Sequence, residues 1–238
     1  MRMHAYASML ASFGLLASAV AIAGSIHVAP TTLTLAPGQP AAVLNVTNEG
    51  DAPANVQVRV FAWDQKNQKD NLTATQKVAA SPPMVTLAPK QTQAVRVVRV
   101  DKSAVAAEEA YRLIIDELPS AKDAPKVGVA VQMRYSVPVF ALPAAKVASG
   151  KVTLNAKVAG NALALQAQNQ GKAHMLASNV MLEDAAGTRT PVVPGLLGYV
   201  LAGQTMQWNI DVPANAAAKG RPVRVSMQFN GQEVKVDL

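Results

Sequence analysis

The chain has no cysteine among its 238 residues, and histidine and aromatic residues are scarce. The absence of cysteine excludes disulfides, thiolate metal ligands and a cysteine nucleophile. Apart from His4 near the N-terminus, only His27 and His174 are present, and two isolated histidines argue against a metal site. Because only 4% of the residues are aromatic, the core has to be built from aliphatic side chains.

Sequence motifs of the common enzyme classes are also missing. The chain has no Gly-x-Ser-x-Gly, no phosphate-binding glycine loop and no His-Glu-x-x-His. Asp116 and Glu117 are adjacent, so on a strand they point to opposite faces and do not suit paired acid–base chemistry. Despite the formal charge of +7, no run of Lys or Arg is longer than two, which argues against nucleic acid as a partner. We therefore expect a protein that is not an enzyme, with no catalytic residue, cofactor or metal.

A long apolar stretch occurs only at the N-terminus. Residues 9–22 are rich in Ala and Leu, follow a basic start at Arg2, and end in Ala21-Ile-Ala23, which fits the small-x-small cleavage rule. The stretch is short for a membrane-spanning helix, so we expect residues 1–23 to be a secretory signal peptide rather than an anchor. No later segment approaches ~20 continuous apolar residues, so we expect the mature chain not to insert into a membrane.

The remainder of the chain has the pattern of β-strands. Short segments rich in Val, Leu and Thr are separated by Pro, Gly, Asn and Asp. The strands expected in the first half are residues 26–29, 31–35, 42–47, 55–63, 84–87, 93–100, 110–118 and 127–140. Those expected in the second half are residues 150–158, 162–169, 177–182, 206–212, 223–229 and 233–238, with a Pro/Gly-rich loop at 191–198.

Short alternating strands at this regular spacing predict an all-β protein made of immunoglobulin-like sandwiches. The mature chain is long enough for two such domains, and residues 142–146 have the composition of a stiff linker. We therefore expect an N-terminal domain at residues 24–144 and a C-terminal domain at 145–238. No tandem repeat is visible, and the two halves resemble each other only in strand content.

The strand at residues 127–140 has the longest alternating pattern. One face is an apolar row, and the other face is mostly small or polar; the row consists of Val127, Val129, Val131, Met133, Tyr135, Val137 and Val139. Such a row either packs inside its own sandwich or is offered to a partner as an exposed edge. The second alternative would indicate a protein whose role is to add a strand to another chain.

Several short motifs follow one another along the chain in a specific order. They are Pro30-Thr-Thr32, Asn45-Val-Thr-Asn48, Ser81-Pro-Pro83, Leu87-Ala-Pro89 with Arg96, Tyr111-Arg-Leu113, Glu117-Leu-Pro119, the alternating strand, and Gly198-Tyr-Val-Leu-Ala-Gly-Gln204 with Trp208. In this order the motifs resemble the periplasmic pilus chaperones of the chaperone–usher pathway, the PapD-like family, and most closely its archaic branch. The resemblance covers essentially all of the chain after residue 23.

The resemblance implies a fold, a compartment and a function. The fold is two immunoglobulin-like domains set at an angle, and the compartment is the periplasm. The implied function is to bind pilin subunits that lack their last strand and to deliver them to an outer-membrane usher, without a cofactor. The last strand of the first domain supplies the missing strand, with Val127, Val129, Val131 and Met133 filling the groove of the subunit. When no subunit is bound, the same strand offers an edge for self-association.

Members of the family also anchor the terminal carboxylate of the subunit with a basic pair between the domains. The positions that usually carry this pair align here with Thr32 and Ser136, so another cation has to take their place. We favour Arg112, because its strand is expected to neighbour the donor strand. Arg134, on the donor strand itself, is the second candidate. Either arginine can instead be solvated or form an interdomain salt bridge.

Three further charged residues follow from the same comparison. Arg96 and Arg99 are basic candidates that lie behind Arg112 and Arg134. Glu109 matches a family position that forms an ion pair between the two domains, so we expect it to contribute to the domain interface.

Two other functions remain open. The first is an exported two-domain adhesin or structural pilus component, which should carry a free alternating extension at its N-terminus. Residues 24–30 are short and run straight into a strand. The second is an enzyme or sugar-binding sandwich, which needs a cluster of carboxylates or aromatic residues; Trp63, Trp208 and four Phe offer little for this.

Overall fold

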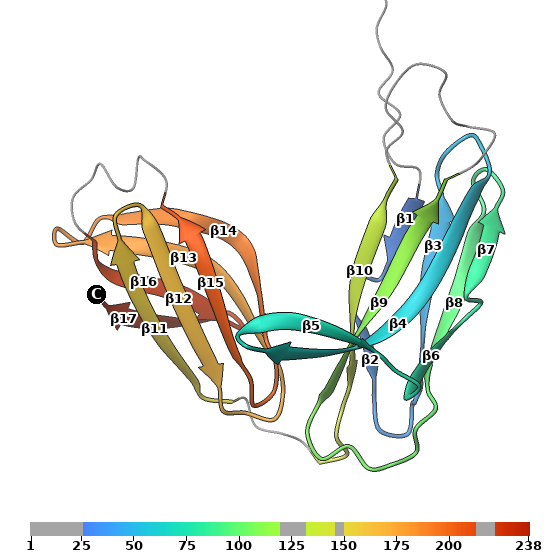
Figure 1. Ribbon diagram of the computed structural model, residues 1–238, viewed down its shortest axis with the longest axis horizontal. Coiled ribbons are helices and arrows are strands. Elements are labelled where there is room, and N and C mark those ends of the chain that lie inside the picture. Colours follow the sequence, from blue (N-terminus) through green and yellow to red (C-terminus); the bar gives the residue numbers. More distant parts are fainter. Residues whose placement is uncertain (1–25, 120–131, 146–149, 213–221) are drawn as a thin grey trace, which may run out of the picture.

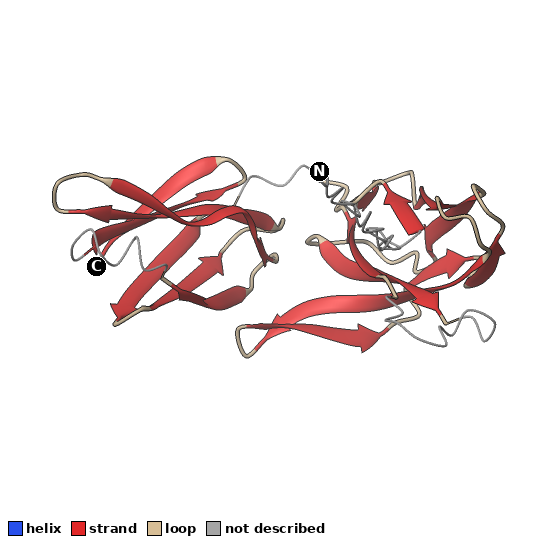
Figure 2. Cartoon of the chain, turned by 90° about the horizontal axis from the view of Figure 1, so that it is seen from above, coloured by secondary structure: helices blue, strands red, loops and turns tan. Residues whose placement is uncertain are grey.

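The computed structural model describes residues 26–119, 132–145, 150–212 and 222–238, and every regular element in these ranges is a β-strand. The strands form two lobes set at an angle (Figures 1 and 2). The predicted all-β class is therefore confirmed. The expected signal peptide lies outside the described residues, as do Val127, Val129 and Val131 of the expected donor strand. Within the described ranges, no helix is long and apolar enough to cross a membrane.

The first lobe is a sandwich of two sheets. One sheet has the strand order β1 (Ile26–Ala29), β3 (Ala41–Asn48), β8 (Thr92–Arg99) and β6 (Val78–Ser81). The other has the order β2 (Leu33–Leu35), β10 (Arg134–Ala141), β9 (Glu109–Leu118), β4 (Ala54–Lys66) and β5 (Lys69–Ala74), and β7 (Met84–Leu87) also pairs with β4. Alternate residues of the two sheets fill the aliphatic core, among them Leu44, Val97, Leu113, Ile115 and Val139.

The second lobe is a smaller sandwich. One sheet has the strand order β11 (Val152–Ala159), β12 (Ala162–Asn169) and β15 (Thr205–Asp211). The other has the order β14 (Arg189–Val200), β13 (Met175–Asp184), β16 (Pro222–Phe229) and β17 (Gln232–Asp237). The core again consists of aliphatic side chains with Met227 and Phe229. The boundary that we expect at residue 145 lies between the end of β10 and the start of β11.

The loop predicted at residues 191–198 is wrong, because this segment lies inside β14. The strand is at the edge of its sheet, so the missing N–H groups of Pro191 and Pro194 remove no hydrogen bond from a second neighbour. Register shifts against β13 and the left-handed Gly195 (φ 76°) absorb the irregular backbone. Proline and glycine were therefore a misleading turn signal at this edge.

The sequence pattern also missed β5 and β6 and ended β4 too early. β4 continues through the polar residues Asp64, Gln65 and Lys66 and returns as β5. The two residues at the tip, Asn67 and Gln68, both have positive φ (51° and 63°), as in the two-residue turns that match the twist of a hairpin. We call this hairpin, residues 61–74, the arm; it extends from the first lobe to the second (Figure 1).

Both lobes contain the same buried asparagine corner, so they share more than strand content. Asn48 and Asn169 are 0% and 1% exposed, and each ends a strand. The side-chain amide of Asn48 donates to the carbonyls of Ala52, Leu87 and Ala88. Asn169 donates in the same way to the carbonyls of Ala173, Val200 and Leu201.

The oxygen of each asparagine accepts the N–H of the glycine two residues later, Gly50 or Gly171. In the amino-acid sequence, each corner is marked by the short motif Asn-x-Gly. Because the amide joins one carbonyl four residues along the chain to two carbonyls more than 30 residues away, the corner fixes the end of each sandwich.

We predict that Asn169→Ala destabilises the second domain by about 1–3 kcal/mol, because buried carbonyls lose their donor. Urea unfolding followed by the fluorescence of Trp208, which packs on the second core, measures the change. Asn155→Ala, at an exposed position of β11, is the matched control and should change the unfolding free energy by less than about 0.5 kcal/mol. Equal stability of the two variants would contradict the prediction.

Candidate functional site

The β10-β9-β4-β5 sheet of the first domain has one face on the core and one facing away from it, which we call the outward face. Residues directly opposite each other in antiparallel strands share a face, and the register pairs Phe61 with Arg112 and Arg112 with Pro138. Alternation along each strand then places further residues on the outward face, namely Arg59, Trp63, Gln65, Ile114, Asp116, Arg134 and Ser136.

The lower end of the outward face packs against the second domain. Trp63, Phe140 and Leu201 are 4%, 1% and 4% exposed and form a small apolar cluster with Tyr199. The Trp63 and Tyr199 rings meet edge to face, with centroids 5.5 Å apart and an interplanar angle of 84°. His174 of the second domain stacks on Phe140 at 3.7 Å. Three aromatic rings, those of Trp63, Phe140 and Tyr199, thus meet at the junction between the domains.

Gln65 on the arm ties the two domains together through hydrogen bonds at both ends of its side chain. Its nitrogen donates to the carbonyl of Tyr199 at 2.8 Å, and its oxygen accepts the N–H of Leu201 at 3.0 Å. The residue is 4% exposed, so an unpaired amide here would cost free energy. At the tip of the arm, the carbonyl of Gln68 accepts the N–H of Gln207 at 3.2 Å.

A carboxylate contact across the domain junction is made by Glu108, one residue before the predicted Glu109. The Glu108 carboxylate accepts the N–H of His174 at 2.9 Å and lies 2.8 Å from Nδ1 of its ring. Glu109 instead pairs inside the first domain, with Lys77 Nζ at 3.0 Å and Arg99 Nε at 3.5 Å. Neighbouring strand residues point to opposite sides, and Glu109 accepts the hydroxyl of core-facing Tyr111 at 2.7 Å.

A pocket of about 530 Å³ lies at this junction, lined by residues of both domains that include Trp63, Lys77, Glu108, Glu109 and Leu201. The ammonium of Lys77 is already paired with Glu109, and Asp101 lies 3.8 Å away. The pocket therefore offers no uncompensated cation for a carboxylate. In the described part of the chain, no group of three or more His, Asp or Glu side chains is placed to hold a metal ion.

Arg112 lies at the upper limit of the junction. Its guanidinium carbon is 3.7 Å from the centre of the Trp63 ring and 5.5 Å from that of Tyr199. Nη1 donates a long hydrogen bond of 3.5 Å to the carbonyl of Ser136, and no carboxylate among the described residues forms an ion pair with it. Burial lowers the pKa of Arg112, and the nearby Asp70 carboxylate opposes this effect only in part. An added anion would therefore stabilise the charged guanidinium.

Arg134, the second candidate, already has a carboxylate partner. Its Nε contacts Asp116, and Nη2 of Arg59 lies 2.5 Å from the other oxygen of the same carboxylate. Burial raises the pKa of Asp116, but hydrogen bonds from Arg134 and Arg59 and their charges lower it by more, so the pKa lies below its ordinary value of 3.8. Asp116 thus bridges the strands on either side of β9.

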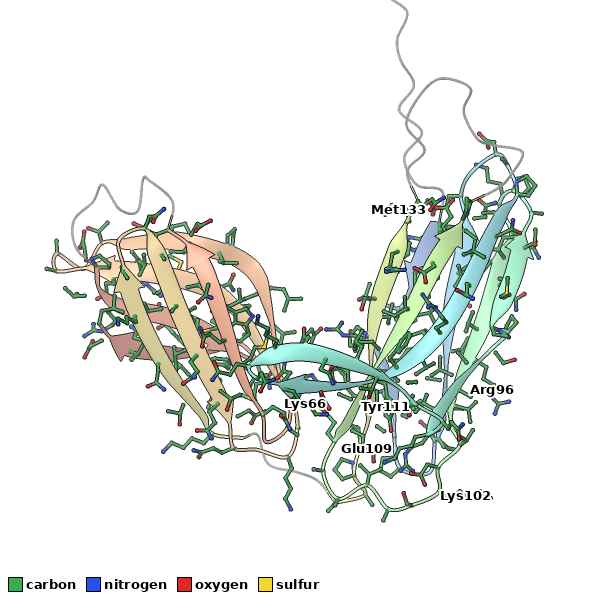
Figure 3. The ribbon with its side chains drawn as sticks, viewed as in Figure 1. Lys66, Arg96, Lys102, Glu109, Tyr111 and Met133 are labelled. Carbon is green, nitrogen blue, oxygen red and sulfur yellow. The ribbon has the colours of Figure 1, made fainter. Side chains whose placement is uncertain are left out.

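The remaining two basic candidates lie away from the outward face. Arg96 is exposed on β8 of the other sheet and lies on the far side of the first domain (Figure 3). The Arg99 side chain is 10% exposed and lies beside Asp101 and Glu109. Of the four arginines, Arg112 is therefore the one that lies at the domain junction without a carboxylate partner among the described residues.

The first half of β10 has a free edge. β10 pairs with β9 over its whole length, from Arg134 to Ala141. On its other side it pairs with β2 only over Val139–Ala141, and no other described strand covers residues 134–138. Unpaired N–H and C=O groups on such an edge can bind a strand from another chain.

The apolar row of this strand divides into two parts. Val137 and Val139 are 5% and 0% exposed and belong to the core of the first domain, with Tyr135 packed against them. These residues therefore follow the first of the two alternatives, packing inside their own sandwich. Met133 is half-buried just before β10, where its carbonyl accepts the N–H of Glu117 at 2.9 Å, and it lies at the upper end of the strand (Figure 3).

Comparison with known families and structures decides the identity of this fold. Residues 25–147 match the model of the family described as pili and flagellar-assembly chaperones, PapD N-terminal domain. The chain belongs to this family. A comparison with curated protein sequences finds no match.

Several solved chaperone structures have the same fold. A chain of the CsuC–CsuE chaperone–tip adhesion subunit complex, from the archaic Csu pili of Acinetobacter baumannii, is 22% identical with a TM-score of 0.66, over 90% of this chain and 98% of that one. A chain of the Salmonella enterica SafA pilin–SafB chaperone complex is 18% identical with a TM-score of 0.61, over 91% and 97%. The Escherichia coli chaperone DraB is 18% identical with a TM-score of 0.54, over 90% and 99%.

Some residues that build the junction of this chaperone were not found from the sequence. Gln65 lies where a strand was expected to have ended, and Glu108 looks like any surface carboxylate next to Glu109. Tyr199 could be found from the sequence, because it lies in the Gly198–Gln204 motif, one of the motifs whose order resembles the family. That motif contributes two bonding groups of the Gln65 contact, the carbonyl of Tyr199 and the N–H of Leu201.

We predict that Asp116 makes the chaperone more stable above its ordinary carboxyl pKa than in acid. A pKa that is lowered on folding gives a contribution that is present above the unfolded value and is lost as the pH falls through the folded value. The free energy of unfolding should therefore decrease between about pH 5 and pH 2, and less steeply in Asp116→Asn. Urea titrations at each pH measure this, with Asp51→Asn at a 95%-exposed side chain as the control. Identical slopes for wild type and Asp116→Asn would rule it out.

Proposed function

We propose that this chain is a periplasmic chaperone that captures pilin subunits by adding its own strand to them and passes them to an outer-membrane usher. The observation that carries the proposal is the free edge of β10 at residues 134–138. In the sequence these residues directly follow the apolar row from Val127 to Met133. Among the similar structures, one is a chaperone in complex with a pilin, and another is a chaperone in complex with a tip adhesion subunit. This role requires no bond to be made or broken.

The affinity of such a strand has two sources. Main-chain hydrogen bonds along the free edge bind an extended strand with little dependence on its sequence. Val127, Val129, Val131 and Met133 add apolar contacts in the subunit groove, each contributing about 1.5–3 kcal/mol if fully buried. Val137 and Val139, which come later in the same row, are buried in the core of the first domain. They fix the C-terminal half of the strand to the chaperone. A second copy of the chain is a competing partner for the same edge when no subunit is bound.

The proposed anchor for the terminal carboxylate of the subunit is Arg112. It lies on β9 beside β10, its guanidinium has no carboxylate partner in the described ranges, and it reaches the carbonyl of Ser136. Ser136 occupies the position where the family usually carries one of its cations, so the longer side chain from the neighbouring strand brings a positive charge to the same place. Arg134 is less suitable because it already forms an ion pair with Asp116.

We predict that Val129→Asp with Val131→Asp abolishes subunit capture, because two carboxylates cannot enter an apolar groove without a large desolvation cost. Tagged chaperone is purified from periplasm and the bound small proteins are identified by mass spectrometry. The matched control is Val43→Asp with Val100→Asp, at positions 54% and 51% exposed on the first domain. The strand-addition role is wrong if the test variant folds and retains the same partner as wild type.

Arg112→Ala is expected to weaken binding of the captured pilin about 10–100-fold, since a charge-assisted hydrogen bond contributes about 1.5–3 kcal/mol. Arg96→Ala removes the same charge at an exposed position and should leave the affinity unchanged. Arg134→Ala should have a smaller effect than Arg112→Ala. Isothermal titration of each folded variant with the purified pilin measures the affinities. An equal loss in the Arg96 and Arg112 variants would mean that Arg112 contributes only to net charge.

A further inference from the structure

The guanidinium of Arg112 lies against two aromatic rings that come from different domains. Trp63 belongs to β4 of the first domain and Tyr199 to β14 of the second, and their centres are 3.7 Å and 5.5 Å from the guanidinium carbon. A cation over the face of an aromatic ring is attracted by the ring quadrupole. The two rings also contact each other edge to face, so movement of one displaces the other.

Each ring is itself fixed by a neighbouring group. Nε1 of Trp63 donates to the carboxylate of Asp70 at 2.9 Å. The backbone of Tyr199 is held by Gln65, which bonds its carbonyl and the N–H of Leu201. The Tyr199 hydroxyl makes no hydrogen bond to any described residue, so the contribution of this side chain to the junction comes from its ring. The place of that ring therefore depends on how the second domain is docked.

We propose that Tyr199 is a positioning residue for the carboxylate anchor, which makes the anchor a composite of both domains. The Trp63 ring of the first domain packs against the Arg112 guanidinium, and the Tyr199 ring of the second domain restricts the orientations that the guanidinium can adopt. The inference rests on the proposed anchoring role of Arg112. Because binding and domain docking are linked, a bound carboxylate also stabilises the docked arrangement by the same factor by which docking improves carboxylate binding.

The test uses the full mature chain and a small probe, N-acetyl-glycyl-leucine, which presents one free terminal carboxylate. Its C-terminal carboxamide has the same side chain without the charge. Binding is followed by NMR through the Nε–H resonance of Arg112, which is assigned by its disappearance in Arg112→Ala. The amide resonance of Leu201, whose N–H bonds Gln65, reports whether the domains remain docked.

Tyr199→Phe keeps the ring and should retain wild-type affinity and the wild-type Arg112 resonance. Tyr199→Leu and Tyr199→Met remove the ring, and the variant that keeps the Leu201 resonance is the one compared. In that variant the affinity for the carboxylate probe should fall about two- to five-fold, the carboxamide should be unaffected, and the Nε–H resonance should move as the ring current is lost.

The outcomes separate this inference from the proposed function. If Arg112→Ala abolishes the preference for carboxylate over carboxamide but removal of the Tyr199 ring does not change it, the positioning role of Tyr199 is overturned and the anchor stands. If Arg112→Ala leaves the preference unchanged, the anchor assignment fails and the role of Tyr199 fails with it. Loss of the preference in Tyr199→Phe as well would overturn the role of the ring, because the hydroxyl would then be required.

Discussion

The buried side chain of Gln65 is the contact on which the arrangement of the two domains depends. Its amide lies beside the apolar cluster of Trp63, Phe140 and Leu201, and it uses both ends to bind the backbone of the second domain. Apolar contacts such as Trp63 with Tyr199 are tolerant of direction, whereas an amide that must both donate and accept fixes one geometry. The arm that carries Gln65 thereby connects the two sandwiches through direct hydrogen bonds.

The functional consequence of this junction is that the outward face has two regions with different chemistry. Its lower part is covered by the second domain and holds Trp63 and Phe140. Its upper part carries the ion-paired Arg59, Asp116 and Arg134, and the two arginine side chains are 43% and 68% exposed. Arg112 lies where the two regions meet, partly buried against aromatic rings yet without a carboxylate of its own. That position combines the low polarity that strengthens an ion pair with the access that a ligand needs.

Much of the fold could be predicted from the sequence because the core is aliphatic and the strands alternate. Alternation along β9 places Leu113 and Ile115 on the inner face and Arg112 and Asp116 on the outward face. Ile114, which is apolar but lies on the outward face, is the exception to the polar pattern. The arm could not be predicted, because Asp64, Gln65 and Lys66 are polar and its burial is against another domain rather than its own sheet. Edge strand β14 was missed because proline is permitted where a strand has one neighbour.

The candidate site could be predicted in part. Arg112 was favoured because its strand was expected to lie beside the donor strand, and the register of β9 with β10 places it there. The pairing of Glu108 rather than Glu109 with the second domain could not be found, since adjacent glutamates differ only in the face to which their strand turns them. Whether Val127, Val129 and Val131 fill a partner's groove stays a prediction.

The bridge formed by Asp116 has a mechanical consequence for β10, the strand whose free edge we propose as the binding site of a partner. Arg59 on β4 and Arg134 on β10 both form ion pairs with Asp116 on β9. The shared carboxylate therefore links three neighbouring strands. A load applied along β10 shears it against β9. Sliding by two residues, the smallest step that keeps apolar side chains inward, would carry Arg134 about 7 Å away from its partner. The two ion pairs of Asp116 therefore oppose sliding of β10 against β9 at the end of the sheet where such a load is applied.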